Sequence, residues 1–230
     1  MGYHQAQLSR QHLSAPLKIR CEAMNTVSSS NDKTLVRDQV KRLRRSLPLS
    51  YQRSKSQAIA HTLIRHIRSK SVSTIAGYLP YRGEVDLIPL LNRARRLGKT
   101  VLLPKVNTDS NTLSFAPWVP HNPLIANRYG ILEPVGTHMC LSQIDTFLVP
   151  LVAFDEQCNR LGMGGGFYDK ALEKVKAHYK PTSIIGIGYD FQRFPSIQPE
   201  PWDVSMDIVV TPSKTYGADA TSKAALQAFR

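Results

Sequence analysis

Arg160-Leu-Gly-Met-Gly-Gly-Gly-Phe-Tyr-Asp169 is the stretch that decides the fold of this 230-residue chain. Before it stands an apolar run, Phe147–Phe154, that predicts a buried strand, and after it the spacing of Leu172 and Val175 predicts a helix. Glycines let a backbone adopt positive φ and approach a ligand, while a helix N-terminus presents free N–H groups and the positive end of its dipole. A strand, a glycine loop and a helix in this order therefore indicate an α/β domain with a phosphate site.

The residues that flank the glycines support this interpretation. Arg160 can neutralise phosphate charge, and Asp169 can hold the Mg²⁺ that accompanies a nucleotide. The two common phosphate loops do not fit. No Lys-Ser or Lys-Thr follows the glycines, and a dinucleotide fingerprint starting at Gly162 would need glycine in place of Phe167. The alternative is a glycine-rich turn that merely lets the helix pack on its strand.

The composition fits a single α/β domain in a reducing compartment. Hydrophobic residues make up 42% of the chain, and 230 residues can bury one sizeable core. The cysteines Cys21, Cys140 and Cys158 are far apart, which indicates neither a disulfide framework nor a zinc site. The sequence has no H-E-x-x-H, no G-x-S-x-G and no run of about 20 apolar residues that could span a bilayer. We expect a cytoplasmic protein without a membrane partner.

The positive charge is concentrated near the N-terminus. The net charge is +13, and residues 32–70 hold eleven basic and two acidic side chains. Such a segment attracts polyanions within a Debye length of about 8–10 Å, whether these are nucleotides or nucleic acid. Tyr51 is its one aromatic residue, whereas stacking on nucleic-acid bases needs interleaved aromatics, so a nucleic-acid partner is disfavoured. Most of these side chains are expected to form a solvated helix face.

Helical and strand-like segments alternate along the chain. Helices are expected at 32–47, 50–67, 87–97 and from 167 onward, and strands at 74–79, 101–103, 113–115, 144–151, 183–188 and 208–210. The first helix should begin at an Asn31 or Asp32 cap, and the second at a Ser50 cap. On the first helix the inward residues are expected to be Leu35, Val40, Leu43 and Leu47. This order predicts a single doubly wound, mostly parallel open sheet with helices on both faces, preceded by two N-terminal helices.

Several polar residues follow the expected strands. In open α/β sheets, ligands bind beyond the carboxyl ends of the strands. We therefore expect segments that are distant in the sequence to meet at one edge of the sheet. They are Tyr81 and Glu84, Lys105, the glycine loop, and Tyr189 with Asp190.

Four blocks of the sequence, in order, resemble one enzyme family. They are Lys33-Thr-Leu-Val-Arg37 with Arg42-Leu-Arg44; Tyr78-Leu-Pro-Tyr-Arg-Gly-Glu-Val-Asp86; Leu148–Asp155 with Asn159–Asp169; and Pro201-Trp-Asp-Val-Ser-Met-Asp207 with Val209-Val-Thr-Pro212. Together they resemble the 5-formyltetrahydrofolate cyclo-ligases (methenyltetrahydrofolate synthetases). The resemblance assigns residues 32–214 to a catalytic domain. Residues 1–31, which are polar and irregular, are expected to form a disordered or poorly ordered extension, and 215–230 a C-terminal tail. Many family members have Lys or Arg between the glycines, where this chain has Met163 and Gly165.

The resemblance implies an ATP- and Mg²⁺-dependent conversion of 5-formyltetrahydrofolate to 5,10-methenyltetrahydrofolate, through a phosphorylated formyl oxygen, with release of ADP and phosphate. Arg160 and Asp169 would be catalytic, and Asp169 and Asp203 would bind the metal. Tyr81, Glu84 and Phe167 would contact the folate, which can carry several glutamates. The ATP-binding positions would be Lys33, Arg37, Arg160, Leu161, Gly162, Met163, Gly164, Gly165, Gly166, Phe167 and Tyr168. The enzyme is expected to act as a monomer, without nucleic acid.

Each of these roles has a structural alternative. Lys33 and Arg37 can be ordinary charges of a helix's first turn, and Asp203 can serve a turn after Pro201. Glu84 can pair with Arg82 at the surface, where such pairs contribute little. Two other functions also stay open: a nucleic-acid-binding α/β protein without catalysis, and an ATP-dependent enzyme that acts on another small substrate.

Overall fold

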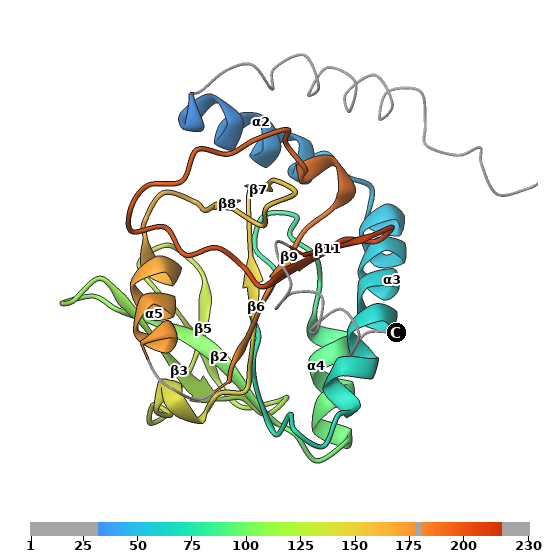
Figure 1. Cartoon of the computed structure of the whole chain (residues 1–230). Coiled ribbons are helices and arrows are strands. Elements are labelled where there is room, and N and C mark those ends of the chain that lie inside the picture. The colour runs from blue at the N-terminus through green and yellow to red at the C-terminus, as the bar shows by residue number, and fades with distance from the viewer. Residues whose placement is uncertain (1–31, 178–180, 218–230) are drawn as a thin grey trace, which may run out of the picture.

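The computed structural model describes residues 32–177 and 181–217. A seven-stranded sheet runs through its centre, with α3 (Leu49–Arg68) and α4 (Ile88–Arg96) on one face and α5 (Phe167–Lys176) on the other (Figure 1). The predicted α/β class with helices on both faces of an open sheet is confirmed. The expected extension at 1–31 and residues 218–230 of the expected tail lie outside the described residues.

The sheet is mostly parallel. Its order is β11-β10-β9-β6-β1-β2-β3, and the five inner strands pair in parallel while β11 and β3 are antiparallel edges. The strands are β1 (Thr74–Ala76), β2 (Thr100–Asn107), β3 (Thr112–Pro117), β6 (Thr146–Pro150), β9 (Ser183–Ile187), β10 (Ile208–Val210) and β11 (Thr215–Gly217). The sequence assigns 215–217 to a tail, but these residues extend the sheet.

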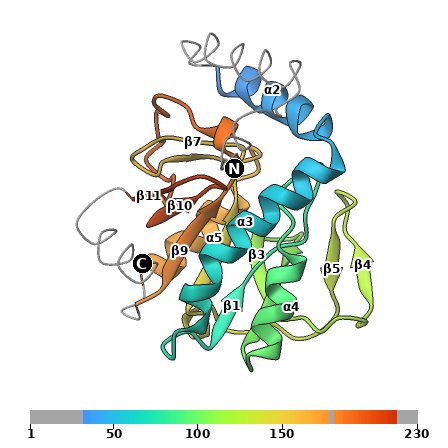
Figure 2. The same ribbon diagram turned by 90° about the vertical axis from the view of Figure 1, so that its right-hand side faces the viewer.

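Two small antiparallel ribbons and two 3₁₀ turns complete the described fold. The ribbon of β4 (Leu124–Ala126) and β5 (Leu132–Pro134) stands beside the main sheet (Figure 2). The second ribbon joins β7 (Ala153–Phe154) to β8 (Arg160–Leu161) and leads into the glycine loop. The 3₁₀ turns are η1 (Leu141–Gln143) and η2 (Asp190–Gln192).

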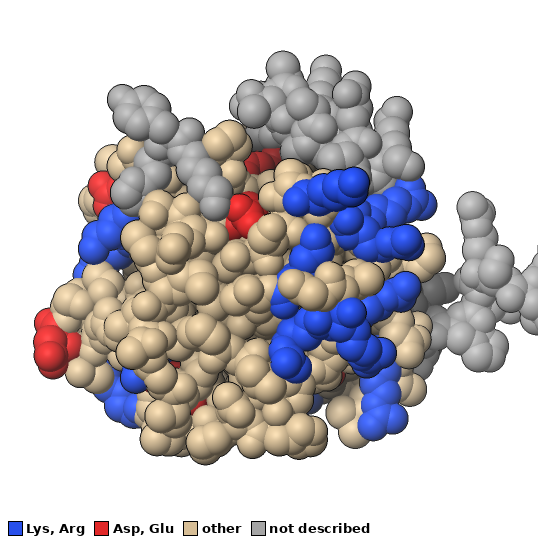
Figure 3. Space-filling model, turned by 90° about the horizontal axis from the view of Figure 1, so that it is seen from below, with Lys and Arg blue, Asp and Glu red and all other residues tan. Residues whose placement is uncertain are grey.

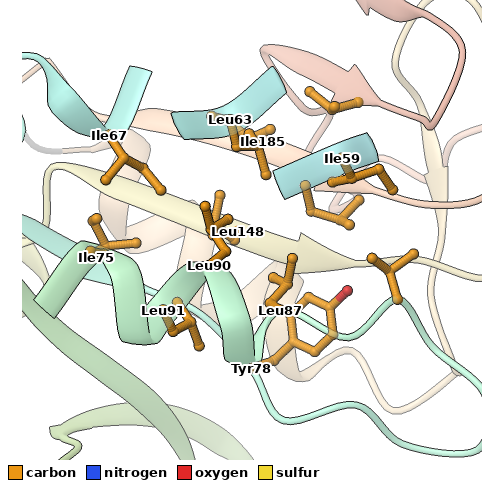
Figure 4. Packing of buried hydrophobic residues seen from close by; sticks show 14 of the residues in the cluster. Ile59, Leu63, Ile67, Ile75, Tyr78, Leu87, Leu90, Leu91, Leu148 and Ile185 are labelled. Atoms are coloured by element: carbon orange, nitrogen blue, oxygen red, sulfur yellow. The ribbon is translucent and has the colours of Figure 1, made fainter. Parts of the chain in front are cut away.

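The core lies on both faces of the sheet. On one face, Ile59 and Leu63 of α3 and Leu90 of α4 pack against Leu148 and Ile185 of the central strands (Figure 4). On the other face, α5 buries Leu172 and Val175 in a second apolar cluster. Burial of one such side chain contributes about 1.5–3 kcal/mol, so these two layers hold the strand ends in fixed positions.

Helix α2 (Lys33–Arg45) follows the sequence prediction in its cap but not in its whole inner face. The Asp32 carboxylate accepts hydrogen bonds from the Thr34 and Leu35 amides, which confirms the predicted cap. Leu35, however, is 40% exposed, and Val36 takes its place in the core. The predicted inner residues Val40, Leu43 and Leu47 are buried. The helix packs on the β7–β8 ribbon and the 194–197 segment, a cluster that includes Val36 and not Leu35.

Other boundaries also differ from the prediction. Helix α3 begins directly after Pro48 without a side-chain cap, so the Ser50 cap is wrong. The strand expected at 144–151 is β6, which begins at Thr146 and ends at Pro150, where the missing N–H ends the ladder as expected. The rest of the apolar run to residue 154 forms β7 outside the main sheet.

Candidate active site

A cavity of about 830 Å³ lies at the carboxyl ends of β1 and β6. The glycine loop, the first turn of α2, the segment after β1 and the β4–β5 ribbon enclose it. Every site residue predicted from the sequence lines this cavity: Lys33, Arg37, Tyr81, Glu84, Arg160, Leu161, Gly162, Met163, Gly164, Gly165, Gly166, Phe167, Tyr168, Asp169 and Asp203. Lys105, Tyr189 and Asp190, which were expected at the same edge, are not among the lining residues.

The glycine loop needs glycine for its backbone shape. Gly164 has φ +102°, and Gly166 has φ +64° at the N-cap of α5. A Cβ on Gly165 would lie 2.6 Å from the Phe167 ring. Arg37 approaches the loop from α2 and donates from Nε to the Gly162 carbonyl at 2.9 Å. The loop therefore presents the first amides of α5 to the cavity with a cation beside them, the arrangement that binds phosphate.

An ion pair joins the two ends of the loop. Arg160 on β8 donates from Nη2 to Asp169 Oδ1 in the first turn of α5, and the same oxygen accepts the Val204 amide at 3.3 Å. The Arg160 side chain is 3% exposed, and its guanidinium lies 5.9 Å from the Tyr168 ring centre. Arg160 Nε is buried and makes no hydrogen bond within the described residues.

A second acidic group comes from the segment after η2. Asp203 Oδ2 accepts the Glu200 amide at 2.9 Å, and Glu200 in turn forms an ion pair of 2.7 Å with Lys33. Asp203 thus serves the turn after Pro201 and also faces the cavity that Asp169 lines. The described residues contain no cluster of three or more His, Cys, Asp or Glu that could hold a metal. Two carboxylates fit Mg²⁺, which keeps several waters and takes its other ligands from substrate phosphates.

Besides the buried Glu133, the cavity has a second, largely buried carboxylate, Glu84. Its side chain is 10% exposed, and its partner is the fully buried Arg44, at 3.3 Å. The surface pair with Arg82 considered from the sequence is wrong. Glu84 Oε2 also accepts the Tyr81 amide at 3.2 Å. Burial raises the pKa of Glu84, while Arg44 and the Tyr81 amide oppose this rise.

Aromatic rings line the mouth of the cavity. The rings of Phe167 and Tyr129 meet edge to face, with centres 5.9 Å apart. Tyr81 Oη donates to the Tyr129 carbonyl at 3.2 Å, which ties the segment after β1 to the β4–β5 ribbon. Phe167 is partly buried and also packs against the core, so it belongs to both the core and the cavity. Flat apolar faces beside a buried carboxylate suit a planar heterocycle with N–H donors.

Sequence reasoning assigned no site role to Arg44, Tyr129, Glu133 or Glu200. Arg44 was visible as part of Arg42-Leu-Arg44, yet nothing local distinguishes its buried position from its exposed neighbours. Tyr129 lies in the turn between two strands that were not predicted. Glu200 stands beside the predicted C-terminal block, and a Lys–Glu pair across 167 positions has no sequence signal.

The basic residues are mostly outside the cavity. Of the eleven in residues 32–70, Lys33 and Arg37 line it. Lys and Arg instead gather on the side of the molecule that carries α3 and α4 (Figure 3), where neither helix contains an acidic residue. The concentration of charge in the sequence is therefore mainly a solvated face, as expected for most of these side chains.

Comparison with known proteins agrees with this geometry. Residues 29–212 match the model of the 5-formyltetrahydrofolate cyclo-ligase family. The chain belongs to this family. The 5-formyltetrahydrofolate cyclo-ligase of Escherichia coli K12 is 38% identical over 181 residues, covering 77% of this chain and 98% of that protein. That of Haemophilus influenzae is 32% identical over 180 residues, covering 76% and 95%.

Solved structures of this cyclo-ligase family share the fold. The 5,10-methenyltetrahydrofolate synthetase of Aquifex aeolicus superposes with a TM-score of 0.70 at 32% identity, covering 81% of this chain and 92% of that one. The Mycoplasma pneumoniae synthetase gives 0.64 at 27% identity, covering 79% and 99%. The family resemblance predicted from the four blocks is confirmed, and with it the assignment of the chain as a ligase of folate metabolism. No helix among the described residues is long and apolar enough to cross a membrane.

Proposed function

We propose that this cyclo-ligase uses ATP and Mg²⁺ to convert 5-formyltetrahydrofolate into 5,10-methenyltetrahydrofolate, releasing ADP and phosphate. The observation that carries the proposal is one cavity that joins a glycine-loop phosphate cradle to a buried carboxylate flanked by aromatic rings. Two substrates of different character can therefore lie end to end in it.

The ATP site is proposed at the glycine loop. The run from Arg160 to Tyr168 would follow the phosphates, with the amides at the start of α5 directed at them. Arg37 holds the loop through Gly162, and Lys33, paired with Glu200, lines the same cavity. Asp169 and Asp203 would hold Mg²⁺, which neutralises phosphate charge when bound.

The folate site is proposed at Glu84. Its carboxylate can accept hydrogen bonds from the amino group and ring N–H of a pterin, while Tyr81 and Phe167 offer aromatic faces to the ring. Between the two sites lies Tyr168, whose hydroxyl makes no hydrogen bond to any described residue. Burial raises the pKa of Tyr168, so its hydroxyl stays protonated and can donate a hydrogen bond.

The chemistry follows from the poor leaving ability of a formyl oxygen. That oxygen attacks the γ-phosphorus, and the bond from phosphorus to the ADP oxygen breaks. The N10 lone pair then adds to the formyl carbon, the carbon–oxygen bond breaks to release phosphate, and N10 loses its proton. Arg160 would stabilise the charge on the transferred phosphoryl group, so that positioning and charge neutralisation supply most of the catalysis.

The test is the near-ultraviolet absorbance of the methenyl product after the full chain is mixed with 5-formyltetrahydrofolate, ATP and Mg²⁺. We expect the band to grow, and to stay absent when ATP is omitted or Mg²⁺ is chelated. ADP release without a methenyl band, in the presence of another small acceptor, would favour the alternative of a related enzyme with a different substrate.

A further inference from the structure

Arg44 is an unusual residue for the last turn of a surface helix. Its neighbours Arg42 and Arg45 are exposed, whereas Arg44 is 1% exposed. Moving a guanidinium out of water costs several kcal/mol unless it is paired and hydrogen-bonded. The partners of Arg44 must therefore compensate the cost of burying its charge.

The Arg44 guanidinium reaches three segments that build the cavity. Nη1 donates to Glu84 Oε1 at 3.3 Å and to the Leu151 carbonyl, just beyond β6, at 3.4 Å. Nη2 contacts Met163 Sδ of the glycine loop at 4.0 Å. One side chain thus touches the proposed pterin carboxylate, the end of the central strand and the proposed phosphate loop.

The backbone of Arg44 also constrains the turn before Glu84. Arg82 and Gly83 both adopt positive φ, at +48° and +80°. A Cβ on Gly83 would lie 2.4 Å from the Arg44 carbonyl oxygen, so this turn sits directly against the end of α2. Glu84 is therefore held from two directions. The turn at Arg82 and Gly83 fixes its backbone, and the Arg44 guanidinium binds its Oε1.

We propose that Arg44 is a positioning residue that orients the Glu84 carboxylate, supplies its counter-charge and sets its distance from the glycine loop. The inference rests on the proposed function, because Glu84 acts there as the pterin acceptor. Arg44 itself need not touch either substrate.

The groups around Glu84 make its charge depend on Arg44. Facing it are Tyr78, Tyr168 and Tyr189, together with the Tyr81 amide and Arg44 itself. Burial raises the pKa of each of these three hydroxyls, so they stay neutral. Arg44 is then the positive charge that opposes the effect of burial on the Glu84 pKa. Without it, Glu84 would take up a proton at higher pH and lose its role as a charged acceptor.

The experiment measures the dissociation constant of 5-formyltetrahydrofolate, without ATP, from about pH 5 to pH 9 for the full chain and its variants. In Arg44→Met we expect folate binding to weaken about tenfold or more at neutral pH, with its pH midpoint moved upward by about one unit or more. Arg44→Lys keeps a charge and should leave the midpoint near that of the original chain. Arg45→Met, one residue on and exposed, is the matched control and should change neither quantity.

A double variant keeps the proposal testable if Arg44→Met does not fold. Arg44→Met with Glu84→Gln contains no buried charge at this pair, and it should bind folate no more weakly than Glu84→Gln does. Steady-state kinetics of Arg44→Met give the KM for each substrate. The proposal is overturned if Arg44→Met weakens folate binding while the pH midpoint stays unmoved, or if its KM for ATP rises as much as its KM for folate. It is also overturned if the double variant binds folate far more weakly than Glu84→Gln does. If the unmodified chain neither binds nor converts 5-formyltetrahydrofolate, the proposed function fails first and this inference fails with it.

Discussion

At the scale of single residues, the site pairs each acidic group with a specific partner. Asp169 accepts from Arg160 and from the Val204 amide, and Glu84 accepts from Arg44 and from the Tyr81 amide. These partners come from distant parts of the chain, so no local spacing reveals them. The sequence could indicate which residues face one cavity, whereas the pairings follow from how α2, β8 and α5 pack.

Replacing Asp169 with Asn should remove nearly all turnover while the fold stays intact. Asn keeps the shape of the side chain, but it loses the charge that faces Arg160 and that would hold Mg²⁺. We expect kcat to fall by about 10²–10³, the size of effect typical for loss of one preorganised electrostatic group. Far-UV circular dichroism would check the fold. Glu173→Gln, on the same helix but exposed, should keep normal activity, and normal activity in Asp169→Asn would exclude the assigned role.

Arg160→Ala should also lose turnover, because the cavity then loses the guanidinium that pairs with Asp169, while Arg37 remains beside the glycine loop. Its removal leaves Asp169 without its charged partner, so some loss of stability is expected as well. Measuring kcat together with the thermal midpoint separates the two effects: turnover should be lost at temperatures where circular dichroism shows the chain still folded. Turnover that falls only in parallel with the folded fraction would assign Arg160 a structural role.

Glu84→Gln should separate the two substrates. A hydrogen bond to a charged group contributes about 1.5–3 kcal/mol, so we expect the KM for folate to rise by about 10- to 100-fold. The KM for ATP should change little, because Glu84 belongs to the proposed folate site and not to the proposed ATP site. Steady-state kinetics with each substrate varied in turn would test this. An equal rise in both KM values would mean that the loop, rather than the folate site, depends on Glu84.

At the scale of elements, the helices follow from the sequence because one apolar face dominates each of them, and the inner strands because they are continuous apolar runs buried on both faces. The ribbons β4–β5 and β7–β8 do not, since their strands of two or three residues do not form separate apolar or alternating runs in the sequence. Tyr129 was missed for this reason. The inner face of α2 was misjudged at Leu35 because the surface it packs on, the β7–β8 ribbon, was not foreseen.

The turn at Gly83 offers a prediction with an internal control. Gly83 and Gly98 have almost the same φ, +80° and +78°, but a Cβ meets the Arg44 carbonyl at Gly83 and open space at Gly98. Gly98→Ala should therefore cost only the left-handed strain, about 1–2 kcal/mol. Gly83→Ala adds a backbone collision and should cost about 1–3 kcal/mol more. Urea denaturation would give both values, and equal costs would show that the turn at Gly83 can move away from α2 freely.

At the scale of the whole molecule, the two core layers fix the sheet that has the cavity at one end. A buried histidine joins one helical layer to this sheet. His66 lies near the end of α3, and its Nε2 is hydrogen-bonded to Thr146 Oγ1 of β6 at 2.9 Å. Nothing in the sequence around His66, which lies between Arg65 and Arg68, indicates that its side chain is buried. The side chain is buried because α3 packs on the sheet, and this tertiary contact cannot be predicted from the local sequence.

Burial lowers the pKa of His66 below its ordinary value of 6.5. A fall in pH should therefore lower the free energy of unfolding through this residue. The unfolded chain takes up this proton as the pH falls through about 6.5, while the folded chain resists until a lower pH. The His66 contribution to stability is thus full above pH 6.5 and declines as the pH drops from there toward the folded pKa. In His66→Gln, the fall in unfolding free energy between about pH 7.5 and 5 should be smaller than in the unmodified chain, although the variant starts less stable. Urea denaturation across this range would measure it. His61→Gln, on the same helix but exposed, should keep the original slope; a slope in His66→Gln as steep as the original would mean that other groups account for the acid sensitivity.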